Sequence, residues 1–167
     1  TATFQDKRTL AVKTVNGRQS SLAFEYAIIA TGSEAARIPQ FDLDSDRLLD
    51  ATAALELEQV PNKLLVIGGG YIGLELGTVY AALGSKVTVV EMTPGLLPGA
   101  DRDLVKPLHK RLEKLFEGRI FLNTKVGSLG DRDDKVEAAF EGPGKFGTER
   151  YDRVLVSIGR RPVTRDI

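Results

Sequence analysis

Three glycines with the spacing G-x-G-x-x-G, namely Gly68, Gly70 and Gly73, follow directly on the apolar run KLLVI. Glycine weakens strands and helices, so three of them at one point indicate a task other than regular structure. In a strand–turn–helix, the first glycine permits a sharp turn, the second lets a diphosphate approach bare backbone, and the third lets the helix pack close to the strands. The N–H groups at the start of the helix then attract phosphates. The spacing therefore predicts a site for a nucleotide diphosphate.

An acidic residue, Glu91, ends the next apolar run, VTVV. A carboxylate at this point accepts hydrogen bonds from both hydroxyls of an adenine ribose and repels a 2′-phosphate. The residues that follow, MTPG, contain no arginine to hold such a phosphate. We therefore expect NAD rather than NADP. The sequence alone leaves two other interpretations open: a glycine-rich turn that binds nothing, and a solvated acid at the end of a strand.

The residues around the glycines predict the elements that must position them. Residues 63–68 read as a buried strand, residues 71–84 as a helix closed by Gly84, and residues 86–91 as a second buried strand. A strand, helix and strand within about 30 residues form a βαβ unit, which is parallel and right-handed. The fold class that we expect is α/β, with a Rossmann-like parallel sheet that carries helices on both faces and a small antiparallel β-meander.

Two further residues end predicted strands and are candidates to line the site. Val126 ends a third strand over residues 119–126, and Gly159 ends the last strand over residues 153–159. Ligands of such sheets lie beyond the carboxyl ends of the strands. Both residues could equally do no more than end their strands.

The flanking segments predict the domain organisation. Residues 1–33 alternate apolar and polar side chains and contain a hairpin turn at Asn16-Gly17, which indicates a strand-rich piece. Residues 34–60 look like a linker, and residues 61–158 form the predicted α/β domain. Because the chain starts at Thr1 and its last residues are polar, we expect it to be a piece of a longer protein.

The composition limits the chemistry. Lys and Arg total 23, as do Asp and Glu, so no net field favours nucleic acid or an anionic membrane as a partner. The chain has no cysteine, which excludes disulfides, thiolate metal sites and cysteine redox chemistry within it. The one histidine, His109, lies in an amphipathic stretch and is expected to be a solvated helix residue. We expect no catalytic residue and no metal site in this chain, and a cytoplasmic setting.

Four segments occur in an order and at a separation that resemble a known family. They are similar to motifs of the flavin-dependent pyridine nucleotide–disulfide oxidoreductases, and they read AIIATGS, VIGGGYIGLELG, VTVVEM and VLVSIGRRP. Within that family, GADRDLVKPL and LNTKV most resemble the bacterial dihydrolipoamide dehydrogenases, which serve as the E3 component of 2-oxo acid dehydrogenase complexes. The resemblance covers essentially the whole chain.

The resemblance implies two cofactors and assigns residues to each. It implies that residues 61–158 are an NAD domain inserted into an FAD domain, of which residues 1–33 and 159–167 are parts. FAD in the parent protein would lie near Thr31, Gly32 and Ser33. The positions that match NAD contacts are Gly68, Gly69, Gly70, Tyr71, Ile72, Gly73, Glu75, Glu91, Val126 and Gly159. Tyr71 matches an aromatic ring that covers the flavin in some relatives, and Glu75 matches an acid near the nicotinamide, although it could simply favour the start of the helix.

The implied activity belongs to a longer protein. The parent would oxidise dihydrolipoamide through a redox disulfide and FAD and pass hydride to NAD⁺, as a homodimer within such a complex. The cysteine pair and the histidine that this needs are absent here. Two alternatives remain: the same domain from a mercuric reductase, a transhydrogenase or an NADH oxidase, and a redox-silent module that senses NAD.

Overall fold

The computed structural model of the 167-residue chain describes residues 1–41 and 43–165. It divides into two units, one made of Thr1–Glu34 with the residues from Arg160 onward, the other of Ala35–Gly159. The predicted linker over residues 34–60 thus falls almost wholly within the second unit, and its residue 42 lies outside the described part. The predicted return segment, residues 159–167, is described as far as residue 165. No helix in the described ranges is long and apolar enough to cross a bilayer.

The first unit contains the predicted antiparallel meander. Its strands pair in the order β1-β2-β3, and Gly17 adopts a φ of 78° in the turn between the last two. The ring centroids of Phe4 and Phe24 lie 5.9 Å apart, edge to face. A second, two-stranded sheet joins β4 to β13. The bounds are β1 Ala2–Asp6, β2 Thr9–Lys13, β3 Gln19–Ala23, β4 Ser33–Ala35 and β13 Arg160–Pro162.

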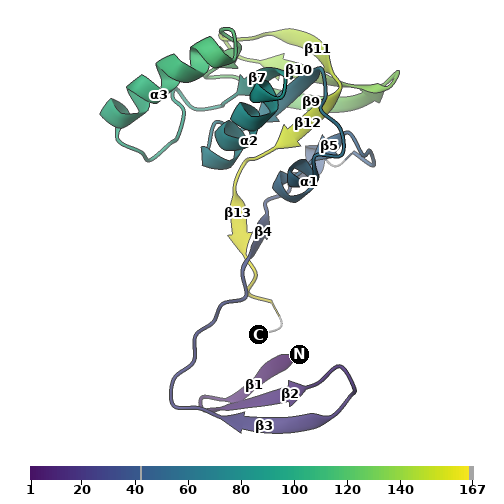
Figure 1. Cartoon of the computed structure of the whole chain (residues 1–167), viewed down its shortest axis with the longest axis vertical. Helices are drawn as coiled ribbons and strands as arrows, with labels where there is room; N and C mark the ends of the chain where they lie inside the picture. The colour runs from purple at the N-terminus through teal and green to yellow at the C-terminus, as the bar shows by residue number, and fades with distance from the viewer. Residues whose placement is uncertain (42, 166–167) are drawn as a thin grey trace. The chain divides into compact units, whose positions relative to one another are not determined.

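A five-stranded parallel sheet forms the centre of the second unit, in the order β5-β12-β6-β7-β8. Figure 1 labels its strands β5, β7 and β12. Leu64, Leu65 and Val66 of β6 are completely buried, because apolar layers cover both faces of the sheet. The parallel sheet that the sequence predicts is confirmed. The strands are β5 Leu48–Leu49, β6 Lys63–Ile67, β7 Lys86–Val90, β8 Ile120–Phe121 and β12 Arg153–Val156.

The α-helices pack on one face of this sheet. Leu74 and Tyr80 of α2 and Leu112 of α3 share a core with Val66 of β6 and Val89 of β7. Ala54 of α1 belongs to the same core. The helices are α1 Ala51–Glu56, α2 Tyr71–Ala82 and α3 Arg102–Leu115, and a short 3₁₀ turn, η1, spans Pro39–Phe41.

The opposite face carries an antiparallel sheet instead of the helices that we expected on both faces. Its strands, β9 Lys125–Arg132, β10 Lys135–Glu141 and β11 Gly147–Tyr151, pair in the order β11-β10-β9. Right-handed crossovers explain the placement. The connections through α2 and α3 step across the sheet in one direction, whereas the connection from β8 back to β12 runs in the reverse direction and must pass over the other face.

The predicted third strand is also corrected. Only Ile120–Phe121 pair with β7, and Val126 is the second residue of β9 rather than the end of a parallel strand. Asn123, with a φ of 48°, lies between the two strands, where the chain leaves the parallel sheet. The run RIFLNTKV reads as one strand because its apolar residues continue through this break.

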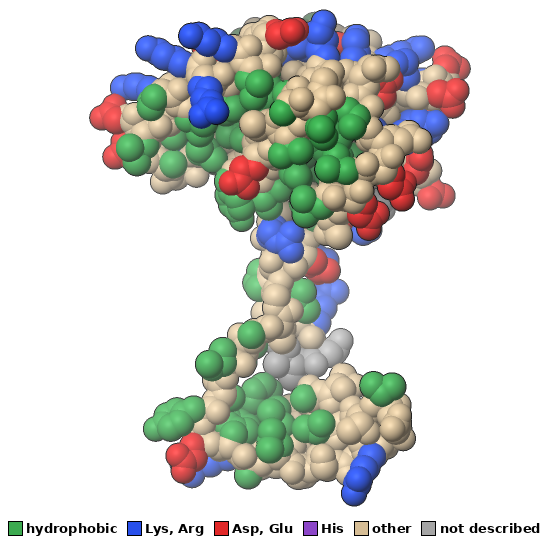
Figure 2. Space-filling view, viewed as in Figure 1, with side chains coloured by type: hydrophobic (Ala, Val, Ile, Leu, Met, Phe, Trp, Pro, Cys, Tyr) green, Lys and Arg blue, Asp and Glu red, His purple; other side chains and the backbone are tan. Residues whose placement is uncertain are grey.

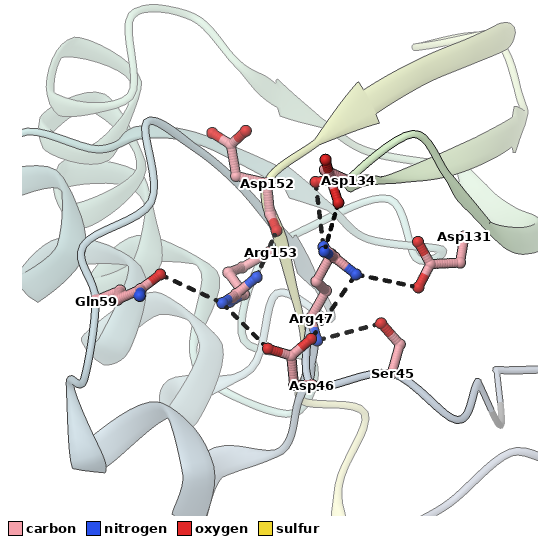
Figure 3. Close-up of polar contacts among 8 residues, drawn as sticks. All are labelled: Ser45, Asp46, Arg47, Gln59, Asp131, Asp134, Asp152 and Arg153. Atoms are coloured by element: carbon pink, nitrogen blue, oxygen red, sulfur yellow. Dashed lines mark hydrogen bonds and ion pairs between the residues drawn. The ribbon is translucent and has the colours of Figure 1, made fainter.

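A group of charged side chains ties the start of the second unit to its sheets (Figure 3). Arg47 donates from Nε to the carbonyl of Asp134, 3.1 Å away, and its Nη1 lies 3.4 Å from a carboxylate oxygen of Asp131. Arg153 in turn contacts Asp46 at 3.5 Å. The segment before β5 is thereby fixed to the β9–β10 turn and to β12. On the face shown in Figure 2, side chains of both charge signs surround the hydrophobic patches of this unit.

Candidate functional site

The turn between β6 and α2 requires glycine at its first motif position. Gly68 adopts a φ of 108°, a conformation that side chains strongly disfavour. A Cβ at Gly68 would lie 2.5 Å from the carbonyl oxygen of Ser157. Its N–H donates to Val90 at 2.9 Å, which holds the turn against the end of β7. The chain therefore leaves β6 sharply and close to the end of β12.

The third motif glycine allows α2 to pack close to the sheet. A Cβ at Gly73 would lie 2.4 Å from Oγ of Ser157 and 2.5 Å from the carbonyl oxygen of Gly68. The side chain of Val66 would lie 2.9 Å away. No larger residue fits here without moving the helix away from β6 and β12.

The second motif glycine has open space in front of it. A Cβ at Gly70 would meet nothing within 4 Å. Gly70 is the N-cap of α2, with extended backbone, and no side chain of the described chain caps this helix. Free N–H groups at the start of a helix attract anions. The bare main chain at Gly70 is therefore accessible to a diphosphate.

Glu91 is fixed in place by the backbone. The residue is 6% exposed, and its Oε2 accepts a hydrogen bond from the N–H of Gly69 at 2.7 Å. Its Oε1 accepts one from the N–H of Thr93 at 2.8 Å. Each carboxylate oxygen has a second lone-pair site. Glu91 can therefore accept ribose hydroxyls while it keeps both backbone contacts.

Gly69 has a role that only the structure reveals. A Cβ there would lie 2.7 Å from Cδ2 of Leu96 and 3.1 Å from Cβ of Glu91. Glycine at this position thus leaves room for the carboxylate and for the fully buried Leu96. The G-x-G-x-x-G spacing does not require it, and we included Gly69 through the family resemblance alone.

These residues surround a groove of about 680 Å³ beyond the carboxyl ends of β6 and β7. This volume lies within the range of about 300–1,000 Å³ that is typical of small-molecule sites. The predicted residues that line it are Gly68, Gly70, Tyr71, Glu91, Val126 and Gly159. Val126 thus reaches the groove although it belongs to β9.

The other predicted residues of this unit do not line the groove. Gly69 and Gly73 lie behind its wall, where they allow close packing. Ile72 is half-buried against the helical core, and Glu75 is exposed on α2. A contact between the last two and NAD stays a prediction of the resemblance.

Sequence reasoning missed much of the groove wall. The loop between β7 and α3 and the segment that contains η1 both contribute. The general rule that ligands lie beyond strand ends points to the loop. No pattern in the sequence points to η1, because its segment precedes β6 by many residues. The missed residues include Met92, Thr93, Leu97, Pro98 and Ala100 from the loop, and Ile38, Gln40 and Phe41 from the segment.

The residues predicted near FAD belong to the first unit. Thr31 Oγ1 donates to the carbonyl of Val163 at 2.5 Å, and the carbonyl of Gly32 accepts from the N–H of Val163 at 3.0 Å. Arg160 donates from Nε to Oγ of Ser33 at 2.8 Å. The segment is therefore bonded to the returning chain, and its relation to FAD stays a prediction.

Known proteins share both the sequence and the fold. Dihydrolipoyl dehydrogenase of Haemophilus influenzae is 46% identical over 161 residues, which are 96% of this chain and 33% of that protein. The Geobacillus stearothermophilus protein of the same name is 42% identical over 99% of this chain and 35% of its own length. The HOCl-induced flavoprotein disulfide reductase RclA of Escherichia coli superimposes with a TM-score of 0.80 at 29% identity, over 99% of this chain and 36% of RclA.

The chain spans about a third of the length of these curated relatives. The sequence pattern of one family, described as pyridine nucleotide-disulphide oxidoreductase, matches residues 1–167. With its glycine turn, its groove and its parallel sheet, this chain belongs to the pyridine nucleotide-disulphide oxidoreductase family.

Proposed function

We propose that this chain is the NAD-binding part of a flavin-dependent dihydrolipoyl dehydrogenase. The observation that carries the proposal is one groove in which open backbone at Gly70 and a fixed carboxylate at Glu91 face the same space. Two dihydrolipoyl dehydrogenases at 46% and 42% identity support the choice of family member.

In this proposal, different parts of the groove bind different parts of NAD. The N–H groups at the start of α2 bind the diphosphate beside Gly70, where no side chain intervenes. Glu91 accepts the hydroxyls of the adenine ribose, and its negative charge disfavours a 2′-phosphate, which favours NAD over NADP. Tyr71, 63% exposed at the start of α2, and Gly159 line the groove and would face the nicotinamide side.

The chain itself contributes binding and orientation rather than reacting groups. It has no cysteine, and Nε2 of His109 lies 3.6 Å from the Glu113 carboxylate on α3. In the proposed parent, FAD would supply to NAD⁺, as hydride, the electrons that dihydrolipoamide gives to a disulfide, and Gly70 and Glu91 of this chain would hold the NAD⁺. Thr31, Gly32 and Ser33 would lie near that FAD. A homodimer within a bacterial, cytoplasmic 2-oxo acid dehydrogenase complex completes the proposal.

A second candidate is another flavoprotein disulfide reductase, and the structural likeness to RclA favours it. The two candidates share this domain and differ in segments that the chain does not contain. A cysteine pair spaced C-x4-C before this region and H-x4-E after it would support the dehydrogenase. A redox-silent NAD sensor would have neither.

The Gly70→Val variant tests the proposed site by calorimetric titration of the full chain with NAD⁺. The valine side chain meets no protein atom near its Cβ, so the fold should persist while the diphosphate is excluded. We expect a loss of affinity of about tenfold or more, or at least about 1.4 kcal/mol. Gly130→Val is the matched control, because Gly130 in β9 also has open space at its Cβ. Unchanged affinity in Gly70→Val would remove the site assignment.

A further inference from the structure

The loop between β7 and α3 forms a wall of the groove and contacts the glycine turn directly. Leu96 is completely buried against Gly69. Leu97 adopts a φ of 50°, which is unusual for a residue with a side chain. Its N–H donates to the carbonyl of Gly69 at 2.8 Å. An unfavourable backbone conformation of this kind persists only where its surroundings hold it in place.

The N–H of Ala100 donates to the carbonyl of Leu97 at 3.0 Å, and one side chain adds to this hold. Arg102, the first residue of α3, donates from Nη1 to the carbonyl of Leu96 at 3.0 Å and from Nη2 to that of Leu97 at 2.7 Å. Its Nε and Nη2 also donate to the carbonyl of Ala100, at 3.1 and 2.9 Å. The planar guanidinium presents several donors in fixed directions, so one side chain can bind three carbonyls at once.

Gly95 leaves the space that the guanidinium occupies. A Cβ at Gly95 would lie 2.6 Å from Nη1 of Arg102. Gly95 does not have a positive φ, so its backbone does not require glycine. The requirement at this position comes from the arginine.

The loop also sets the orientation of the peptide that links Gly69 to Gly70. The carbonyl of Gly69 accepts from Leu97, and the N–H of Gly69 donates to Glu91 at 2.7 Å. In a planar trans peptide the carbonyl and the following N–H point in opposite directions. Leu97 therefore fixes the direction of the N–H of Gly70, the N-cap residue of α2.

We propose that Arg102 is a positioning residue for diphosphate binding. Through Leu97 it holds the Gly69–Gly70 peptide in the orientation that presents the Gly70 N–H to the groove. Arg102 is not itself among the residues that line the groove. The inference rests on the proposed function, because it assigns the diphosphate of NAD to this groove.

Calorimetry of the full chain with NAD⁺ and with ADP-ribose tests the inference. Arg102→Gln removes the charged fork, and we expect the affinity for both ligands to fall about tenfold. Arg102→Lys should recover only part of the loss, because an ammonium cannot bind three carbonyls in the same geometry. Arg111→Gln, the same change on the exposed side of α3, is the control and should bind like the unmodified chain.

Two further measurements separate positioning from a general loss of stability. Hydrogen exchange without ligand should accelerate at the Leu97 amide in Arg102→Gln and stay unchanged at the Val89 amide in the core. Gly95→Ala should weaken binding to a similar degree, and its effect should not add to that of Arg102→Gln, because both disturb one contact.

The results separate a failure of the role proposed for Arg102 from a failure of the proposed function. If the unmodified chain binds NAD⁺ and Arg102→Gln binds it equally well with Leu97 still protected, the inference is wrong and the proposed function stands. If the unmodified chain binds neither NAD⁺ nor ADP-ribose, both are wrong.

Discussion

Backbone N–H groups fix the carboxylate of Glu91, the residue that we propose discriminates between cofactors. Both of its oxygens accept backbone N–H groups, at 2.7 and 2.8 Å, so the carboxylate cannot swing away from a 2′-phosphate without breaking these bonds. A phosphate monoester carries a charge of about −1.5 to −2 at neutral pH. Repulsion at this point should therefore be strong.

Glu91→Ala should reduce the preference for NAD over NADP. The variant removes the acceptor of the ribose hydroxyls, so NAD affinity should fall, while NADP loses its repulsive contact. The buried amide of Gly69 also loses its acceptor, at a cost in stability of about 1–3 kcal/mol, and the half-buried amide of Thr93 loses its acceptor at a smaller cost. Calorimetry with both cofactors measures the ratio of affinities, and Glu113→Ala on α3 is the control. Equal affinity of the unmodified chain for NADP and NAD would show that the cofactor assignment is wrong.

Alanine substitutions at two glycines of α2 distinguish the effect of close packing from the effect of helix propensity. A Cβ at Gly73 would lie 2.5 Å from the backbone carbonyl of Gly68, whereas at Gly77 the nearest atom would lie 3.4 Å away. Alanine favours a helix over glycine by about 0.5–1 kcal/mol in both variants. We expect Gly77→Ala to be neutral or stabilising and Gly73→Ala to destabilise by about 1–3 kcal/mol. Urea unfolding compares them, and equal stability of the two variants would argue against close contact at Gly73.

A charged network joins β11 to the parallel sheet. Glu149 accepts from Arg119 at 2.7 Å and from Lys145 at 2.5 Å, and Arg119 also donates to the buried Thr88 of β7 at 2.8 Å. Burial alone would raise the pKa of Glu149, but the hydrogen bonds and positive charges of Lys145 and Arg119 lower it to about 2. The carboxyl side chain is 20% exposed, so solvent screens it little.

The lowered pKa predicts a dependence of stability on pH. Because the folded-state pKa of Glu149 lies below its unfolded value of 4.5, its contribution is complete above about pH 4.5 and is lost as the pH falls toward 2. A shift of this size corresponds to roughly 3 kcal/mol. In urea unfolding between pH 7 and pH 3, the free energy of unfolding should fall less steeply with decreasing pH in Glu149→Gln than in the unmodified chain. Part of the slope should remain, since Lys135 also lowers the pKa of Asp152. An equally steep fall in the free energy of unfolding would show that Glu149 does not make this contribution.

The sequence predicts the glycine turn, α2, β6 and β7. The spacing of apolar residues that identifies these elements, and the glycines that end them, are local features of the chain. It does not predict the face covered by β9–β11, since alternation identifies strands without saying which sheet they join. The sequence pattern also does not indicate a role for Arg102. Its partners are backbone carbonyls of a loop, and such contacts depend on loop geometry rather than on residue pattern.

For the molecule as a whole, the two units differ in how much core they contain. The second unit has both described cores, one on each face of its parallel sheet. Every residue in the three strands of the meander is exposed or half-buried. All residues that line the candidate groove belong to the second unit.

The most direct test of the central claim is a crystal structure of the chain grown with NAD⁺. We expect the diphosphate against the backbone at Gly70, at the start of α2, with the adenine ribose hydroxyls within hydrogen-bond distance of Glu91. Dinucleotide bound at another place, or a turn at residues 68–73 closed by side chains with no ligand in the groove, would contradict it.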